Sequence, residues 1–406
     1  MSRRILQPFP AERWQRTLYI AFFGQLVSAM AFSLIFPFLP LYVQYLGTRL
    51  GPSLEFWAGM AFSSQAITMT LASPIWGALS DRHGRKLMLE RAMFGGAVLL
   101  CLMAFVRSAE ELVLLRAIQG LITGTVSAAN ALVAGEAPRE RIGYAMGLLQ
   151  VGFWGGVAVG PLIGGVLADI WGFRVPFLLT GALLLISGIL IWLGVHEEFS
   201  PCAAAARADG FLSGWGDLLR RPGIRITYLL RFVATVGQTL IQPVAPLFIQ
   251  SLLSPGAPVG TFTGVTAGLA SAASIGSAIY LGRVGDRLGQ RRMLRASLAG
   301  AALLYLLQSF VTNAWQLLVL QMFGGAALGG VIPTLSALLA RYGRYGEEGN
   351  IYGLDNSISS AARALAPMLG ASIAMGLSLR TTFAASGVLF FLSAVLAGAG
   401  LPRRET

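Results

Sequence analysis

Long uninterrupted apolar stretches recur along the whole of this 406-residue sequence. Each is about 20 residues long, the length that an α-helix needs to cross the hydrocarbon core of a bilayer. Backbone polar groups must be satisfied internally in lipid, so only helices or a closed barrel can span it. Because the stretches are continuous and do not alternate with polar residues, the sequence predicts an all-α integral membrane protein.

The apolar stretches predict twelve transmembrane helices. We expect them near residues 18–43, 57–79, 87–107, 112–135, 142–168, 174–195, 224–250, 259–282, 293–313, 315–340, 351–377 and 380–401. The composition agrees, since 55% of the residues are hydrophobic and 12% are charged. The net charge of +12 does not indicate nucleic-acid binding, because most Lys and Arg residues fall in the termini and the even-numbered loops. By the positive-inside rule, both termini are cytoplasmic.

The second half of the sequence repeats the first. The longest polar interruption, 196–223, predicts a cytoplasmic linker between an N-terminal bundle, 1–195, and a C-terminal bundle, 224–406. The charged turn 77–86 has a weaker copy at 282–291, and Gly160-Pro161 matches Ala366-Pro367. Internal duplication of a six-helix unit is typical of transporters whose halves are related by an axis along the membrane normal.

Three motifs carry candidate functional residues. Gly77, Asp81, Arg82, Gly84, Arg85 and Lys86 form the charged turn between spans 2 and 3. Arg116, Gln119, Gly120, Thr123, Ser127 and Asn130 form or border one polar face of span 4. Gly156, Gly160, Pro161 and Gly164 place small residues on one face of span 5, a spacing that lets helices approach closely. The alternative interpretations are a topological charge cluster, interhelical hydrogen bonding and plain packing, respectively.

Polar and charged residues in other spans complete the candidate set. They are Gln25, Ser28 and Phe32 in span 1, Arg231, Thr235, Gln238 and Gln242 in span 7, and Arg363 in span 11. Charges inside spans are costly and therefore indicate function. No acidic residue lies near a span centre, so we expect an anionic or amphiphilic solute to neutralise the arginines. The alternative for Arg363 is bonding to backbone carbonyls near Pro367.

These motifs together resemble the major facilitator superfamily. The charged turn is similar to its loop 2–3 signature, and Leu115-Arg116-x-x-Gln119-Gly120 is similar to its span 4 motif. Gly156-x-x-x-Gly160-Pro161 resembles its antiporter motif, and Pro37-x-x-Pro40 resembles its drug-efflux branch. The stretches 31–43 and 73–77 are similar to drug:proton antiporters of the MdtG type. The resemblance covers the whole chain, and it implies two six-helix bundles that rock about a central substrate path.

The resemblance also implies roles for individual residues. Asp81 would latch the cytoplasmic side by meeting the start of span 11, with Asp355 as the partner. Arg82, Arg85 and Lys86 would hold the turn to Glu136, Glu140 or lipid phosphates. The glycine face of span 5 would pack on span 8, and spans 1, 4, 7 and 10 would line the cavity.

We therefore expect a multidrug exporter of the cytoplasmic (inner) membrane, driven by proton antiport. The alternatives are an exporter or uniporter of a specific metabolite or lipid and, in another class, a non-transporting membrane sensor or scaffold. We expect no enzymatic activity, cofactor or metal, and no nucleic-acid partner. The expected partners are a small-molecule substrate and membrane lipids, and the expected state is a monomer. Proton coupling rests on the resemblance, since no carboxylate is visible at mid-membrane.

Overall fold

The computed structural model describes residues 13–401 except 52, 123, 125–128, 131, 134–136, 139–140, 196, 198–210 and 344–346. For residues 13, 74, 77, 78, 81, 82, 211–214, 348 and 349 it describes the backbone alone. The described part is helical and contains no strand. Its helices are α1 (Arg13–Leu34), α2 (Leu39–Leu46), α3 (Leu54–His83), α4 (Arg85–Met103), α5 (Ala109–Ile122), α7 (Ile142–Trp171), α8 (Arg174–Gly194), α9 (Phe211–Arg220), α10 (Pro222–Thr239), α11 (Ala245–Leu252), α12 (Val259–Leu288), α13 (Gln290–Gln308), α14 (Ala314–Gly329), α15 (Val331–Tyr342), α16 (Glu348–Gly376) and α17 (Leu379–Gly400).

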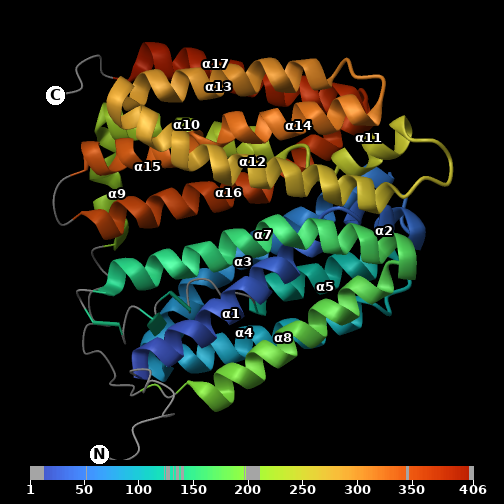
Figure 1. Ribbon diagram of the computed structural model, residues 1–406, viewed down its shortest axis with the longest axis horizontal. Coiled ribbons are helices and arrows are strands. Elements are labelled where there is room, and N and C mark those ends of the chain that lie inside the picture. Colours follow the sequence, from blue (N-terminus) through green and yellow to red (C-terminus); the bar gives the residue numbers. More distant parts are fainter. Residues whose placement is uncertain are drawn as a thin grey trace, which may run out of the picture.

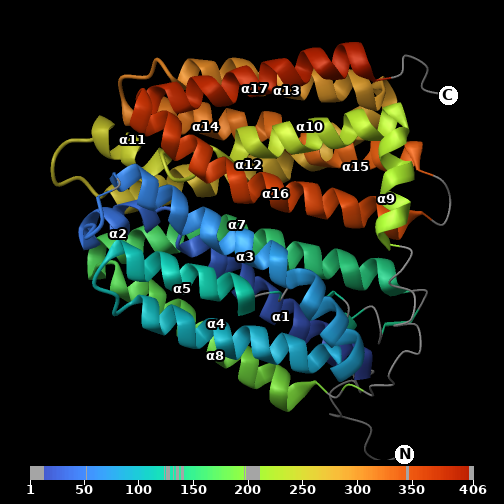
Figure 2. The same cartoon turned by 180° about the vertical axis from the view of Figure 1, so that it is seen from behind.

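The helices form two groups that lie side by side (Figure 1). The first helix group, α1–α8, is blue to green, and the second helix group, α9–α17, is yellow-green to red; the reverse view in Figure 2 shows the same division. Each group has its own hydrophobic core. All six clusters of buried apolar residues in the described structure draw their members from one group alone. The two groups can therefore move relative to each other without disrupting either core.

The structure confirms the internal duplication. Helices α3 and α4 begin and end 205 residues before α12 and α13. The turns between them also match, with φ of 97° at Gly84 and 92° at Gly289, a conformation that favours glycine. The side chain of Lys86 donates to the carbonyl of Trp192, and Arg291, its equivalent in the repeat, donates to the carbonyl of Ala397. The repeat therefore extends to individual hydrogen bonds.

Four predicted spans are interrupted rather than continuous. Spans 1 and 7 each divide into two helices, α1 with α2 and α10 with α11, next to Pro37 and Pro243. Proline lacks an N–H donor and its ring clashes with the preceding turn. In span 4, α5 ends at Ile122 and Gly124 has a φ of 149°. Span 10 divides into α14 and α15 at Gly330. Apolar length alone predicted the spans but not these breaks.

Seven stretches of the described helices are long and apolar enough to cross a membrane by themselves. They are Trp14–Leu34, Ile142–Trp171, Arg174–Gly194, Val259–Leu288, Ala314–Tyr342, Asn350–Gly376 and Leu379–Gly400. They come from both helix groups, so the structure supports a multi-pass membrane protein.

The two groups meet along two antiparallel helix pairs, α7 with α12 and α3 with α16. We call the end of the molecule that carries α2 and α11 the Asp169 end, and the opposite end the α9 end (Figure 1). At the Asp169 end the backbones touch, since a Cβ atom at Gly264 would clash with the carbonyl of Pro161. Toward the α9 end, the ribbons of α7 and α12 draw apart (Figure 1). The groups are thus closed at the Asp169 end and diverge toward the α9 end.

Candidate functional site

A buried ion pair joins α10 to α16 in the second helix group. Nη2 of Arg231 lies 3.0 Å from Oδ2 of Asp355, and the two side chains are 14% and 8% exposed. Nε of Arg231 also donates to the hydroxyl of Ser359 at 3.1 Å. Removing one partner of such a pair leaves a buried charge uncompensated, which is strongly destabilising. Asp355, predicted as the partner of a latch to Asp81, is therefore bound to Arg231 within its own group.

Arg363 lies on the same face of α16 as Asp355 and Ser359, because residues four apart are neighbours on a helix. It interacts electrostatically with Arg231 and Asp355. Its side chain is nevertheless exposed, and it forms no hydrogen bond or ion pair with any residue that the structure describes. This helix packs on α10. The predicted bond to backbone near Pro367 is not formed.

The other residues of the predicted polar stripe of span 7 differ in their exposure to solvent. Gln238 is exposed, Gln242 is partly buried, and the Thr235 hydroxyl donates to the carbonyl of Arg231 at 2.8 Å. Arg363, midway along α16, and Gln238, near the end of α10, are thus exposed polar side chains of the second group.

Arg116 in the first helix group differs from Arg363 in its burial. Its side chain is fully buried, and Nη1 donates to the amide oxygens of Gln65, at 2.9 Å, and Gln119, at 3.0 Å. Its Nε and Nη2 atoms have no hydrogen-bond partner among the described residues. Gly120 lies against α3, where a Cβ atom would clash with Thr68. Arg116 is therefore sealed between α3 and α5 and is not exposed in this conformation.

The structure also describes most of the remaining predicted residues of spans 1 and 4. Gln25 is 1% and Ser28 9% exposed, and neither side chain has a hydrogen-bond partner within the described structure. Phe32 is 40% exposed and its ring meets Phe36 edge to face. Asn130 is partly buried. Thr123 and Ser127 lie outside the described residues, so their part of the stripe stays a prediction.

The charged turn is anchored within the first helix group. The carboxylate of Glu197, after α8, accepts from the backbone N–H groups of Arg85, at 3.0 Å, and Lys86, at 2.8 Å, at the start of α4. Nζ of Lys86 lies 3.5 Å from Glu90. A carboxylate at a helix N-terminus is favourable because it faces the positive end of the helix dipole. The predicted partners Glu136 and Glu140 lie outside the described residues, and the sequence analysis missed Glu197.

Three members of this motif, Gly77, Asp81 and Arg82, are described by backbone alone. Asp81 lies in the last turn of α3, and Arg82 follows it. Gly77 is also helical, and Gly84 supplies the positive φ that ends α3. The latch between Asp81 and the start of span 11 therefore stays a prediction.

The glycines of the span 5 motif pack on α1, whereas Pro161 of the same motif packs on α12, the helix of the predicted span 8. Cβ atoms at Gly156, Gly160 and Gly164 would clash with the α1 backbone or with Ser33. The Ser33 hydroxyl donates to the carbonyl of Gly156 at 3.2 Å. Spacing alone showed that a close partner was required, but it did not identify which helix would supply it.

The opposite side of α7 meets α12, and its polar contact was missed by the sequence analysis. Asp169, near the end of α7, accepts hydrogen bonds from the backbone N–H of Gly260 at 3.1 Å and of Thr261 at 2.6 Å. Beside it, a Cβ atom at Gly165 would clash with the carbonyl of Gly260. A carboxylate four residues beyond Gly165 was the available signal, but its partner Gly260 lies 91 residues away.

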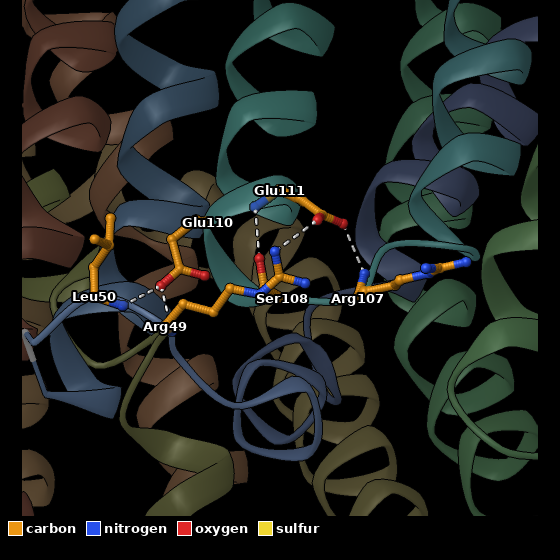
Figure 3. Close-up of polar contacts among 6 residues, drawn as sticks. All are labelled: Arg49, Leu50, Arg107, Ser108, Glu110 and Glu111. Carbon is orange, nitrogen blue, oxygen red and sulfur yellow. Dashed lines mark hydrogen bonds and ion pairs between the residues drawn. The ribbon is translucent and has the colours of Figure 1, made fainter.

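A second carboxylate at this end clamps a loop of the first helix group (Figure 3). One oxygen of Glu110 accepts from the backbone N–H groups of Arg49, at 2.7 Å, and Leu50, at 2.9 Å. Glu111 accepts from the N–H of Arg107 at 2.8 Å and lies 3.6 Å from Arg49. Loss of hydration raises the pKa of the Glu110 carboxyl, but the hydrogen bonds, chiefly from Leu50, outweigh this and lower the pKa to about 2.

The described side chains include no group of three or more His, Cys, Asp or Glu residues that could hold a metal ion. Several of the polar groups described above bind one another or backbone groups, and Arg363 and Gln238 are left exposed. Such groups can bind a solute non-covalently.

Comparison with known proteins gives the family. The sequence profile described as Major Facilitator Superfamily matches residues 21–257 and 227–406. Multidrug resistance protein MdtG of Dickeya zeae is 34% identical over 97% of this chain and 96% of its own length. The MdtG protein of Serratia proteamaculans is also 34% identical, over 97% of this chain and 95% of its own.

Solved structures show the same fold. The nucleoside transporter NupG matches with a TM-score of 0.78 at 13% identity, over 94% of this chain and all of that one. The human organic anion transporter MFSD10 (TETRAN) matches with a TM-score of 0.65 at 21% identity, over 96% of this chain and all of that one. The chain is a transporter rather than an enzyme, and it belongs to the major facilitator superfamily.

Proposed function

We propose that this protein exports drugs or other small amphiphilic solutes from the cytoplasm by alternating access, in exchange for protons. The observation that carries the proposal is the arrangement of the two helix groups, which touch at the Asp169 end and diverge toward the α9 end. Relatives named multidrug resistance protein, 34% identical along nearly the whole chain, support the class of solute.

We infer that the chain crosses the membrane twelve times, with bundles at 1–195 and 224–406 joined by the linker 196–223. In this arrangement α1 with α2, α10 with α11, and α14 with α15 each form one interrupted span. The concentration of Lys and Arg in the termini and even-numbered loops supports a cytoplasmic position for both termini and the α9 end. The protein acts as a monomer in the inner membrane, and the proton gradient, not a bound cofactor, supplies the energy.

The solute carries a negative charge or an electron-rich polar group. Arg231 is neutralised by Asp355, whereas Arg363 is exposed and forms no bond with the described residues. The local charge is therefore positive, and a charge-assisted hydrogen bond from a guanidinium favours an anionic group. Gln238 supplies a further exposed amide on α10.

The test is solute transport in proteoliposomes with an imposed pH gradient. The probes are naphthalene-2-sulfonate and a naphthylmethyl-trimethylammonium ion, which share an aromatic body and differ in charge. We expect the sulfonate to move faster and its movement to follow the pH gradient. Arg363→Gln should lower its initial rate by about tenfold or more, since hydrogen bonds to charged groups contribute about 1.5–3 kcal/mol.

Arg225→Gln is the matched control, because Arg225 is an exposed arginine on α10 nearer the α9 end. It should leave the rate close to that of the unmodified protein. Transport that ignores the pH gradient would refute antiport, and equal transport of both probes would refute the preference for anions. No transport of either probe would contradict the proposed export itself.

A further inference from the structure

Asp169 forms a polar bond between the two helix groups. It lies near the end of α7, and its two carboxylate oxygens accept from the N–H groups of Gly260 and Thr261 in the first turn of α12. These N–H groups have no partner within their own helix. The carboxylate also faces the positive end of the α12 dipole. The contact therefore stabilises the closed Asp169 end, and it must break if that end opens.

The surrounding packing makes this contact sensitive to small movements. A Cβ atom at Gly260 would lie 2.8 Å from the Asp169 carboxylate, and one at Gly264 would clash with Pro161. Backbone therefore lies on backbone, with few interlocking side chains at these positions. Such surfaces separate without rotamer changes, whereas the two hydrogen bonds require one definite position of α12. The hydrogen bonds of Asp169 thus fix the position of α12 in this contact.

Two of the contacts between the groups share one arrangement. In each, a helix of the first group runs antiparallel to a helix of the second, α7 with α12 and α3 with α16. Each first-group helix carries an aspartate near its end, Asp169 in α7 and Asp81 in α3. Each of these ends lies on the side of the molecule where the partner helix starts. The resemblance predicted such a latch for Asp81, and Asp169 forms the equivalent contact at the opposite end.

We propose that Asp169 is a positioning residue for transport, whose carboxylate holds the outer side closed by binding the start of α12. Each opening to the outside releases this bond. Asp81 and Asp169 then close opposite ends in alternation, and the relative strength of the two contacts sets how long each conformation persists. This inference rests on the alternating access proposed above for the same protein, not on the identity of the solute.

The test measures the separation of the two groups at the outer end. Spin labels are attached at Gly51→Cys and Ser254→Cys, exposed loop positions in the first and second groups, after Cys101→Ala and Cys202→Ser remove the native thiols. Double electron–electron resonance then gives the distance distribution of the full-length protein in lipid nanodiscs, without solute. We expect Asp169→Ala to increase the ratio of long-distance to short-distance populations about tenfold. Asp169→Asn, which keeps one acceptor oxygen, should give an intermediate ratio.

Glu55→Gln is the matched control. Glu55 is a partly buried carboxylate at the same end, in the first turn of α3. It should not change the distance distribution. Unchanged distributions in both Asp169 variants would overturn the inference, as would equal shifts in Asp169→Asn and Glu55→Gln. Because no solute is present, these results do not depend on whether the naphthalene probes are exported.

Discussion

The two faces of α7 make equally close contacts, but one contact lies within the first helix group and the other joins the two groups. Gly156, Gly160 and Gly164 lie against the α1 backbone, and Ser33 adds a buried hydrogen bond to this contact. Both helices belong to the first group, so the contact persists while that group stays folded. On the other face, Gly165 and Asp169 meet α12 of the second group.

The difference shows that glycine spacing alone does not distinguish a permanent contact from a reversible one. Gly164 and Gly165 are consecutive residues, yet one face packs within a hydrophobic core and the other lies between two independent cores. The helix group that supplies the partner decides the role. We therefore expect the largest effect when a glycine is replaced by alanine on each face of α7 in turn.

We expect Gly165→Ala to change conformation and Gly164→Ala to change stability. The Cβ atom at residue 165 would clash with Gly260 of α12, so the two groups must separate at the Asp169 end. At residue 164 it would clash with Leu34 of α1, inside one group. Overpacking of this kind costs about 1–3 kcal/mol. Spin-label distances between Gly51→Cys and Ser254→Cys should lengthen for Gly165→Ala alone.

Thermal unfolding in detergent provides the second measurement for this pair. Gly164→Ala should unfold at a lower temperature, and Gly165→Ala should keep a melting temperature close to that of the parent. The comparison would fail if Gly165→Ala destabilised the protein as much as Gly164→Ala without changing the distances.

A smaller effect distinguishes two carboxylates at the same end. Glu110 holds the N–H groups of Arg49 and Leu50 within one group, whereas Asp169 holds those of Gly260 and Thr261 across the groups. In Gly165→Ala, hydrogen-exchange protection should fall at residues 260 and 261 and stay unchanged at 49 and 50. Equal loss at all four amides would indicate general loosening of this end.

The Glu110 contact should also resist acid. Its pKa is lowered to about 2, so its stabilising contribution is complete above the ordinary carboxyl pKa of about 4.3 and is lost as the pH falls toward 2. Protection factors at Arg49 and Leu50, corrected for intrinsic exchange, should therefore match at pH 7 and pH 5. A marked loss of protection at pH 5 would contradict this.

The smallest effect concerns Ser33→Ala. It removes the buried hydrogen bond to Gly156 and should lower the free energy of unfolding by about 1 kcal/mol. Because the bond lies within the first helix group, the spin-label distances should not change. A shift of those distances by Ser33→Ala would show that the α1–α7 contact also takes part in the conformational change.

The helical architecture and its repeat were predictable because they depend on local features. Apolar length predicts spans, and an offset of 205 residues between Gly84 and Gly289 predicts matching turns. The breaks beside Pro37 and Pro243 were less visible, since proline also occurs inside the unbroken helices α7 and α16, at Pro161 and Pro367.

The site was only partly predictable, because its contacts depend on tertiary neighbours. Arg116 and Arg231 have similar positions in their polar stripes, yet one is sealed by Gln65 and Gln119 and the other is paired with Asp355. Asp169 binds Gly260 and Thr261, which lie 91 and 92 residues further along the chain. Sequence periodicity shows which residues share a face, but not which helix that face meets.

The central claim, that α7 and α12 separate during transport, is tested most directly by linking them. A Cβ atom at Gly268 of α12 would lie 3.9 Å from Cβ of Leu162 in α7, a spacing suited to a disulfide. The control pair is Gly300 and Ala327, whose Cβ atoms would lie 3.8 Å apart in α13 and α14 of one group. In the cysteine-free background, oxidation of Leu162→Cys with Gly268→Cys should abolish transport and reduction should restore it, while oxidised Gly300→Cys with Ala327→Cys should still transport. Full transport by the oxidised α7–α12 pair would contradict the claim.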